Sequence, residues 1–187
     1  MPPKVKVTKE EIIQAALNLI RENGGNTINA RSIAGAMNCS TQPIFSNFVT
    51  MDELQETVIA AVYDLYLDFL KKEAERGEYP QYKAFGMAYI RFAREEKELF
   101  KLLFMCDRGG KELTPTADFN ASVEIIMKSI GITRQKAELM HLEMWTCVHG
   151  IATMLATSFI DLDWKLISDM ITDVYQGVRT RHLSKEI

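Results

Sequence analysis

Apolar residues recur three and four positions apart along most of this chain, with few helix-breaking residues between them. The first stripe is Ile13, Ala16, Leu17 and Ile20. This spacing places the four side chains on one face of an amphipathic helix. Among 187 residues, 10 Gly and 5 Pro are too few for the many turns of a sandwich or barrel. The pattern therefore predicts an all-α protein.

Capping residues mark the ends of the first predicted helix. Thr8 and Glu11 have the spacing of a capping box, in which a hydroxyl and a carboxylate satisfy the first free amides. Residues 23–25, Asn-Gly-Gly, tolerate the left-handed conformation that ends a helix. We therefore expect one helix that starts after Thr8 and stops at this stretch.

Two short helices are predicted next, with a tight turn between them. Asn29 can cap a helix over residues 30–37, and Ser40 can cap another over residues 41–48. Asn38, which lies between them, is suited to a left-handed turn. A longer helix followed by such a pair is typical of a helix-turn-helix unit.

The remainder of the chain keeps the helical spacing. Thr50 and Glu53 form another capping box, which predicts a long helix that ends near Gly77. Two apolar stripes follow Pro80 before a break at the Gly-Gly of residues 109–110. Further helices are predicted over residues 115–130, 133–159 and 163–182.

The formal net charge of −3 conceals an uneven distribution. Residues 1–50 contain five basic and three acidic side chains, a balance of +2, so the remainder carries −5. A basic segment on an acidic body favours a polyanion as the partner of that segment alone. Chance scatter in a mildly acidic protein explains the charges equally well.

The cysteines and the apolar runs indicate the cellular compartment of the protein. Cys39, Cys106 and Cys147 are widely spaced and form no CxxC pair, which is typical of a reducing compartment rather than of disulfides or a zinc site. The first nine residues lack the apolar stretch of a secretory signal, and no uncharged apolar run approaches about 18 residues. We therefore expect a cytoplasmic protein without a membrane segment.

The second short helix has the composition that DNA reading requires. The major groove admits one helix, whose N-terminal residues must be small and polar enough to reach base edges. This helix opens with Ser-Thr-Gln at residues 40–42, and we expect Ser46 and Asn47 to be exposed on a similar side. Phe48 is expected to anchor the helix to the core. A plain three-helix subdomain with solvent-facing polar residues explains the spacing equally well.

Several short stretches between Thr8 and Leu54 carry a family resemblance. They are Asn-Gly at 23–24, Arg-Ser-Ile-Ala at 31–34, Cys-Ser at 39–40, Ile-Phe at 44–45 with Phe48, and Asp-Glu-Leu at 52–54. In order and spacing they resemble the tetracycline-repressor (TetR) family of transcriptional regulators. The resemblance implies a helix-turn-helix DNA-binding domain over residues 1–51. It also implies a helical ligand-binding and dimerisation domain over residues 52–187.

A second resemblance lies in the C-terminal half. Residues 145–150 read Trp-Thr-Cys-Val-His-Gly, and residues 91–93, 99–100 and 103–104 precede them as Arg-Phe-Ala, Leu-Phe and Leu-Phe. These stretches resemble the TetR-type ligand domain that carries a Trp-x-x-x-His-Gly signature. The two resemblances together cover most of the chain.

The candidate DNA-binding residues combine the basic N-terminal segment with the two short helices. They are Lys4, Lys6, Asn29, Arg31, Ser40, Thr41, Gln42, Phe45, Ser46 and Asn47. The family often has Tyr, His and Lys where this chain has Phe45, Asn47 and Met51. Because the Tyr hydroxyl and the Lys ammonium commonly touch phosphates, the resemblance implies weaker or differently placed DNA contacts here. Lys4 and Lys6 can compensate from an N-terminal arm.

The candidate ligand-binding residues are mostly aromatic residues and Met. They are Phe92, Phe104, Met105, Phe119, Met127, Trp145 and His149. Trp145 and His149 are four residues apart and share one side of a helix. Such side chains with few polar tips suit a mostly apolar small molecule. Core packing is the alternative for each residue, and a hydrogen-bonded core histidine explains His149 equally well.

The last two predicted helices carry more apolar surface than one chain covers easily. Residues 133–159 are apolar on two faces, and the final helix adds Ile167, Ile171, Val174 and Val178. We expect these helices to pair with their symmetry mates in a homodimer. Coverage by other helices of the same chain is the alternative.

Together these features predict a ligand-responsive regulator, in our interpretation a repressor, that binds palindromic operator DNA as a homodimer. No HExxH, GxSxG or Walker sequence occurs, so we predict no enzyme activity, catalytic residue, metal or cofactor. The alternative is a helical small-molecule-binding or scaffolding protein with weakened or lost DNA binding.

Overall fold

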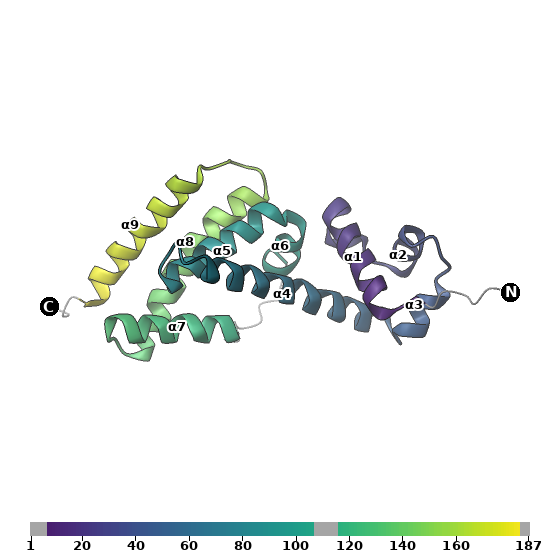
Figure 1. The fold of residues 1–187 in the computed structure, drawn as a ribbon, viewed down its shortest axis with the longest axis horizontal. Helices are drawn as coiled ribbons and strands as arrows, with labels where there is room; N and C mark the ends of the chain where they lie inside the picture. The colour runs from purple at the N-terminus through teal and green to yellow at the C-terminus, as the bar shows by residue number, and fades with distance from the viewer. Residues whose placement is uncertain (1–6, 107–115, 184–187) are drawn as a thin grey trace. The chain divides into compact units, whose positions relative to one another are not determined.

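The computed structural model describes residues 7–106 and 116–183, and every regular element in this part of the chain is a helix (Figure 1). The elements are α1 (Lys9–Asn23), the 3-10 helix η1 (Gly25–Thr27), α2 (Ala30–Ala36), α3 (Gln42–Asn47), α4 (Met51–Arg76), α5 (Gln81–Glu95), α6 (Lys97–Phe104), α7 (Ala117–Ile130), α8 (Arg134–Ala156) and α9 (Trp164–Leu183). The predicted all-α fold is confirmed.

Local hydrogen bonds explain where α1 begins and ends. Thr8 Oγ1 accepts from Glu11 N over 3.2 Å, and Glu11 Oε2 accepts from Thr8 N over 2.8 Å, which completes the predicted capping box. Gly24 ends the helix with φ +81°, a conformation that favours glycine. The buried face is turned slightly from the predicted one, because Ile12 is fully buried while Ile13 is half-buried.

The helix-turn-helix unit forms as predicted except at its second cap. Asn29 Oδ1 accepts from Arg31 N and Ser32 N at 3.0 and 2.9 Å and thereby caps α2. Asn38 has φ +50° and supplies the expected left-handed turn residue. The predicted Ser40 cap is wrong, because Thr41 already has helical backbone angles and takes the N-cap position without a side-chain bond.

Contacts between helices divide the described residues into two compact units. Unit 1 contains residues 7–67 and 96–106, and unit 2 contains residues 68–95 and 116–183. The long helix α4 belongs in part to each unit, and α6 belongs with the N-terminal helices. This division differs from the boundary between residues 51 and 52 that the sequence suggests.

An ion pair and a close approach place α6 in unit 1. The Glu96 carboxylate accepts from Arg21 Nε at 2.8 Å and from Arg21 Nη2 at 2.9 Å, and it raises the pKa of Arg21. A Cβ on Gly25 would lie 2.8 Å from Leu102 Cδ1, so glycine lets α6 approach η1 closely. Helical periodicity could not reveal this packing, because Arg21 and Glu96 are 75 residues apart.

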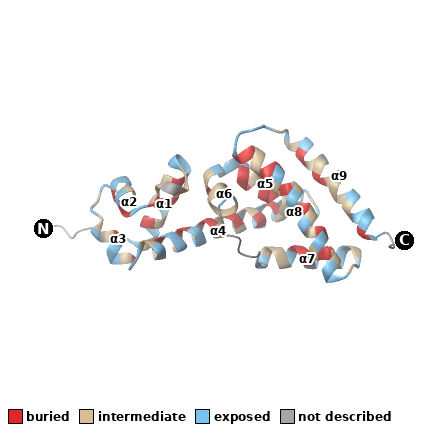
Figure 2. Cartoon of the chain, turned by 180° about the vertical axis from the view of Figure 1, so that it is seen from behind, coloured by how far each residue is buried: buried red, intermediate tan, exposed pale blue. Residues whose placement is uncertain are grey.

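Unit 2 has its core along α5 and α8, where Figure 2 shows the buried residues concentrated. α7 and α9 pack against α8. The Glu73 carboxylate of α4 is only 2% exposed and accepts from Arg91 Nε and Arg76 Nη1, each at 2.9 Å. The Arg91 guanidinium lies 4.3 Å from the centroid of the Trp164 ring. One charged network therefore joins α4, α5 and α9.

Candidate DNA-binding surface and ligand-binding core

The short helix α3 presents a mixed polar and aromatic surface. Gln42 and Ser46 are exposed, and the Phe45 ring is 54% exposed. The Ser46 hydroxyl donates to Gln42 O over 2.9 Å, whereas the Gln42 amide has no partner in the described part of the chain. An exposed glutamine amide can read a base edge, and an exposed Phe can contact a thymine methyl group.

The other predicted DNA-binding residues differ in the exposure of their side chains and in the partners these side chains have. Arg31 is exposed in the first turn of α2, and no carboxylate of the described residues lies within 4.0 Å of its guanidinium. Ser40 is exposed and Thr41 is half-buried. Asn29 is exposed, but its side chain is the cap of α2. Lys4 and Lys6 lie outside the described residues.

Asn47 departs from its predicted exposure. The residue is half-buried, and its Nδ2 donates to Pro43 O at 2.8 Å and to Val7 O at 3.2 Å. The expectation that Asn47 stands exposed beside Ser46 is therefore wrong. Its position at the end of α3 turns the side chain back toward the backbone that precedes α1.

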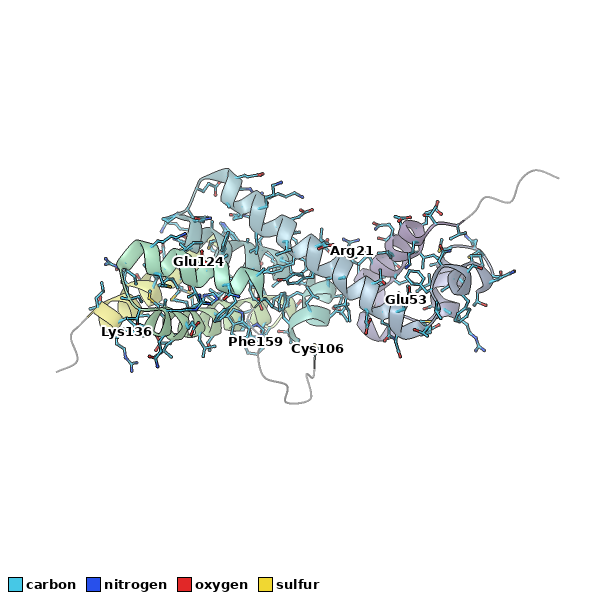
Figure 3. The ribbon with its side chains drawn as sticks, turned by 90° about the horizontal axis from the view of Figure 1, so that it is seen from below. Arg21, Glu53, Cys106, Glu124, Lys136 and Phe159 are labelled. Atoms are coloured by element: carbon cyan, nitrogen blue, oxygen red, sulfur yellow. The ribbon has the colours of Figure 1, made fainter. Side chains whose placement is uncertain are left out.

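Two cations of the N-terminal segment are already paired with carboxylates. Lys9 Nζ lies 3.1 Å from Glu53 Oε1, and Arg21 is paired with Glu96 as described above. Glu53, labelled in Figure 3, also accepts from Val49 N at 2.7 Å. The Val49 amide and the Lys9 ammonium hold the pKa of Glu53 below its ordinary value. Among the described basic residues of this segment, Arg31 is therefore the one without a carboxylate partner.

An aromatic and polar cluster occupies the middle of unit 2. The rings of Trp145 and His149 are stacked with centroids 4.9 Å apart and planes 17° apart. His149 Nδ1 lies 2.9 Å from the Tyr89 hydroxyl of α5. Burial lowers the pKa of His149 and raises that of Tyr89, so both groups are neutral at neutral pH. Phe92 is fully buried and packs edge-on against Phe69.

A second Tyr–His pair repeats the arrangement. The Tyr82 hydroxyl lies 2.9 Å from His141 Nδ1, and the Phe119 ring of α7 packs edge-on against His141. Burial lowers the pKa of His141 to about 4, although the nearby Asp118 carboxylate opposes this change. Burial is also the main cause of the raised pKa of Tyr82. Met127 packs on the adjacent core of α7 and α8.

The sequence reasoning missed Tyr82, Tyr89, His141 and Asp118 as members of this cluster. A signal was present, because the two Tyr are seven residues apart on α5 and the two His are eight apart on α8. Each spacing is close to two helical turns. Two predicted ligand residues, Phe104 and Met105, belong to unit 1. There Phe104 packs against Tyr66 and Phe100, and Met105 is 40% exposed.

An open surface groove lies elsewhere in unit 2. It is lined by Gln81, Ala121, Glu124, Ile125, Lys128 and Ser129. Glu124 is labelled on α7 in Figure 3. None of the predicted ligand-binding residues lines the groove, so we assign it no role in ligand binding.

The outward faces of α8 and α9 each carry apolar and small residues that are not buried, which we call the α8–α9 stripe; on α9 the exposed Asp173 lies on the same face. On α8 it consists of Leu139, Leu142, Thr146 and Gly150, and on α9 of Leu166, Met170 and Gly177. The three leucines are 43–49% exposed. A Cβ added to either glycine would meet no atom of another element among the described residues within 4 Å. Beyond α8, Phe159 is 80% exposed (Figure 3).

The structure corrects which face of the final helix is free. Ile167 and Ile171 are 0% and 3% exposed, because α9 turns them toward its own chain. Two residues of the stripe that the sequence suggested for dimerisation are therefore covered within the chain, whereas Val174 and Val178 of that stripe are half-buried. The exposed large apolar residues of α9 are Leu166 and Leu183, and Met170 is half-buried.

Residues 7–106 and 116–183 contain neither a metal-binding cluster nor a membrane-spanning helix. There, no three His, Cys, Asp or Glu side chains lie close enough together to hold a metal ion. None of the helices in these residues has the length and apolarity needed to cross a membrane.

Comparisons with known proteins agree with this architecture. Residues 82–173 match the family described as "Tetracyclin repressor-like, C-terminal domain". An HTH-type transcriptional regulator of Mycobacterium tuberculosis is 21% identical over 182 residues, which cover 94% of this chain and 84% of that protein.

Solved structures share the fold at low sequence identity. A TetR-like transcriptional regulator from Rhodococcus sp. RHA1 covers 100% of both chains with a TM-score of 0.65 and 14% identity. The fatty acid degradation regulator FadR from Bacillus halodurans has a TM-score of 0.61 and 16% identity, over 94% of this chain and 97% of that one. Residues 82–173 of this chain therefore match a tetracyclin repressor-like C-terminal domain, and the chain as a whole shares the fold of a TetR-like transcriptional regulator.

Proposed function

We propose that the protein is a cytoplasmic, ligand-responsive repressor that binds palindromic operator DNA as a homodimer. Residues 1–51 form the proposed DNA-binding domain and residues 52–187 the ligand-binding and dimerisation domain. The observation that carries this proposal is the surface of α3, where an unpartnered Gln42 amide stands next to an exposed Phe45 ring. A helix that reads the major groove must present exposed side chains to the base edges, and Gln42 and Phe45 are exposed on α3.

DNA selection tests this function directly. The wild-type protein is incubated with a randomised duplex pool of about 30 base pairs, which is long enough for two half-sites one helical turn apart. We expect a palindromic sequence to be enriched, and Gln42→Ala to weaken its binding more than that of a shuffled duplex. Failure to enrich any sequence would contradict the proposal and favour the alternative of a helical small-molecule-binding or scaffolding protein.

Homodimerisation through α8 and α9 is the second part of the proposal. Glycine inside a helix costs about 1 kcal/mol relative to Ala, and neither Gly150 nor Gly177 is required by packing within the chain. Both glycines lie in the α8–α9 stripe, where small residues allow a second helix to approach closely. The exposed leucines of the same stripe give a partner apolar area to bury.

The effector is proposed to bind in unit 2 beside Trp145 and His149. The Tyr89–His149 pair offers neutral hydrogen-bonding groups next to stacked aromatic rings, which suits a mostly apolar molecule with a polar end. The fold neighbour from Bacillus halodurans is described as a regulator of fatty acid degradation, which makes acyl-chain compounds reasonable first probes.

Tryptophan fluorescence tests this site. The chain has two Trp, so Trp164→Phe leaves Trp145 as the single reporter and keeps an aromatic ring beside Arg91. We expect decanoic acid or 1-decanol to change the emission saturably, and His149→Ala in the same background to weaken that response. An emission change that His149→Ala leaves unaltered would argue against the site.

A further inference from the structure

One hydroxyl of α8 is buried without a partner. The Oγ1 atom of Thr153 is shielded from solvent and has no hydrogen-bond partner among residues 7–106 and 116–183. No other buried side-chain nitrogen or oxygen of these residues is left unsatisfied. Burying a hydroxyl without a hydrogen bond costs free energy, so such a group in a folded protein needs an explanation.

The other threonines inside helices of the described chain bond within their own helix. A hydroxyl donates to the carbonyl oxygen four residues earlier, over 2.7 to 2.9 Å, in Thr57, Thr146, Thr172 and Thr180. The corresponding acceptor for Thr153 is the carbonyl of His149, and that bond is not formed. The Thr153 hydroxyl therefore remains available to a group from outside α8.

Thr153 continues the side of α8 on which the proposed effector site lies. Trp145, His149 and Thr153 follow one another at intervals of four residues, so each lies about one turn beyond the last. The Trp145 and His149 rings are stacked, and His149 Nδ1 lies 2.9 Å from the Tyr89 hydroxyl. The unpartnered hydroxyl is therefore the next polar group along this side of the helix.

The register between α5 and α8 explains why Thr153 lacks a partner on α5. The two Tyr–His pairs advance together along both helices, so α5 and α8 run side by side in the same direction. Continuing by four residues from Tyr89 and His149 sets Thr153 level with Ala93, which is fully buried. An alanine side chain can neither donate nor accept a hydrogen bond.

The electrostatics of the site disfavour a negatively charged ligand. Burial, and to a smaller extent the Asp118 carboxylate, raises the pKa of Tyr89, and burial lowers the pKa of His149, so both groups are neutral at neutral pH. The Arg91 guanidinium of α5 is already held by the Glu73 carboxylate. A carboxylate head would thus meet a like charge and neutral groups in the described part of the site, which is unfavourable for a buried anion.

We infer that Thr153 binds the polar head of the effector and that this head is uncharged, as in an alcohol, an amide or an ester. The inference rests on the proposed function, whose effector site it extends. The apolar body of the molecule packs against the stacked rings of Trp145 and His149. Its head forms the hydrogen bond that the protein itself does not give to Thr153 Oγ1.

Thr153→Val removes the hydroxyl while keeping the shape of the side chain, and two effects of opposite sign are expected. Without effector the urea midpoint should rise, because a buried polar group without a partner is removed. Binding of 1-decanol, followed by Trp145 emission in the Trp164→Phe background, should weaken about tenfold, because the bound head loses its hydrogen bond. A lower urea midpoint or an unaltered affinity would overturn the inference, because the fold would then already use the hydroxyl or the head would not.

Two control variants accompany this measurement. Thr153→Ser keeps the hydroxyl, so it should restore most of the affinity for 1-decanol that Thr153→Val loses. Thr157→Val removes an exposed hydroxyl at the end of the same helix, one that already donates to Thr153 O at 2.8 Å. We expect Thr157→Val to bind 1-decanol as the parent does. An equal loss of affinity in Thr157→Val would contradict a specific role for Thr153.

Decyl compounds with different heads test the predicted absence of charge. At about pH 8 decanoate is an anion, whereas 1-decanol and decanamide are neutral and carry a chain of the same length. We expect the two neutral compounds to bind at least about tenfold more tightly than decanoate, and Thr153→Val to narrow this difference. Decanoate binding as tightly as the neutral compounds would refute an uncharged head.

The same titrations separate failure of this inference from failure of the effector site. No saturable change of Trp145 emission with any of the three compounds in the Trp164→Phe parent would refute the proposed effector site, and this inference with it. A saturable change that His149→Ala weakens and Thr153→Val leaves unaltered would refute the inference alone. Enrichment of a palindromic duplex remains the separate test of DNA binding.

Discussion

At the scale of single residues, unit 2 depends on polar groups that are buried with defined partners. Glu73 is 2% exposed between Arg91 and Arg76, and His141 is held by Tyr82 and Phe119. A buried charge or imidazole is tolerated because these partners replace water. Removing one partner therefore has a larger effect than a surface change of the same chemistry.

Glu73→Ala tests the buried charged network. The substitution leaves Arg91 without its main carboxylate partner, which we expect to cost about 3 kcal/mol of unfolding free energy. Glu75→Ala is the matched control on α4, because its side chain is 63% exposed and lies 4.0 Å from Lys71; we expect less than about 1 kcal/mol there. Urea unfolding of both variants measures the loss of unfolding free energy. Equal losses would show that the burial of Glu73 has no energetic consequence.

The lowered pKa of His141 predicts that the stability of the protein depends on pH. Its pKa falls from an ordinary value of 6.5 to about 4 in the folded protein, so between these values the unfolded chain binds more protons. The linked contribution of His141 to the free energy of unfolding is therefore fully present above pH 6.5 and is lost as the pH falls toward 4. Its size is on the order of 3 kcal/mol.

The variant His141→Gln keeps an acceptor for the Tyr82 hydroxyl and removes the titration. We expect its urea midpoint to fall less than that of the wild type between pH 6.5 and pH 4. Part of the slope should remain, because burial also lowers the pKa of His149. Identical pH profiles would exclude His141 as the source.

At the scale of elements, the short helices depend on their caps more than on their length. α2 has seven residues, and the Asn29 side chain satisfies two of its first amides. Asn29 is also a predicted DNA-binding residue, so its two roles must be separated. A helix this short has little intrinsic stability and relies on such local bonds and on packing.

Asn29→Ala and Asn29→Ser separate capping from DNA contact. We expect Ala to cost about 1 kcal/mol of stability and Ser, which also caps well, to cost little. If Asn29 is only a cap, Asn29→Ser binds the enriched duplex as tightly as the wild type. A loss of affinity with unchanged stability in Asn29→Ser would assign the side chain to the DNA.

At the scale of the whole molecule, the proposed homodimer determines how two recognition helices act together. The α8–α9 stripe is where this property can be tested without altering unit 1. Leu142 is 43% exposed, so a charge at this position is tolerated in a single chain but would be buried in a dimer.

Leu142→Glu is expected to yield a monomer in sedimentation experiments. The monomer should lose at least about tenfold in affinity for the palindrome, because only the dimer engages both half-sites at once. Gln176→Glu on α9 is the control, since it adds the same charge at an exposed position outside the stripe. A dimeric Leu142→Glu protein would contradict the assigned interface.

Local sequence patterns predict the helices, the caps of α1 and α2 and the resemblance to TetR-like regulators, but not the start of α3. The Thr8–Glu11 box, the Asn29 cap and the Asn38 turn depend on residues at most three apart, so local rules suffice to predict them. The TetR resemblance likewise follows from motif order along the chain.

Which of these side chains remain free depends on how the helices pack against one another. Asn47 is engaged by Val7 across 40 residues, and Tyr82 meets His141 across 59. Ile167 is covered by its own chain, although its spacing resembles that of an interface residue. Helical periodicity gives the direction of a side chain around its own axis. The partner it meets depends on how separate helices pack, which no local pattern encodes.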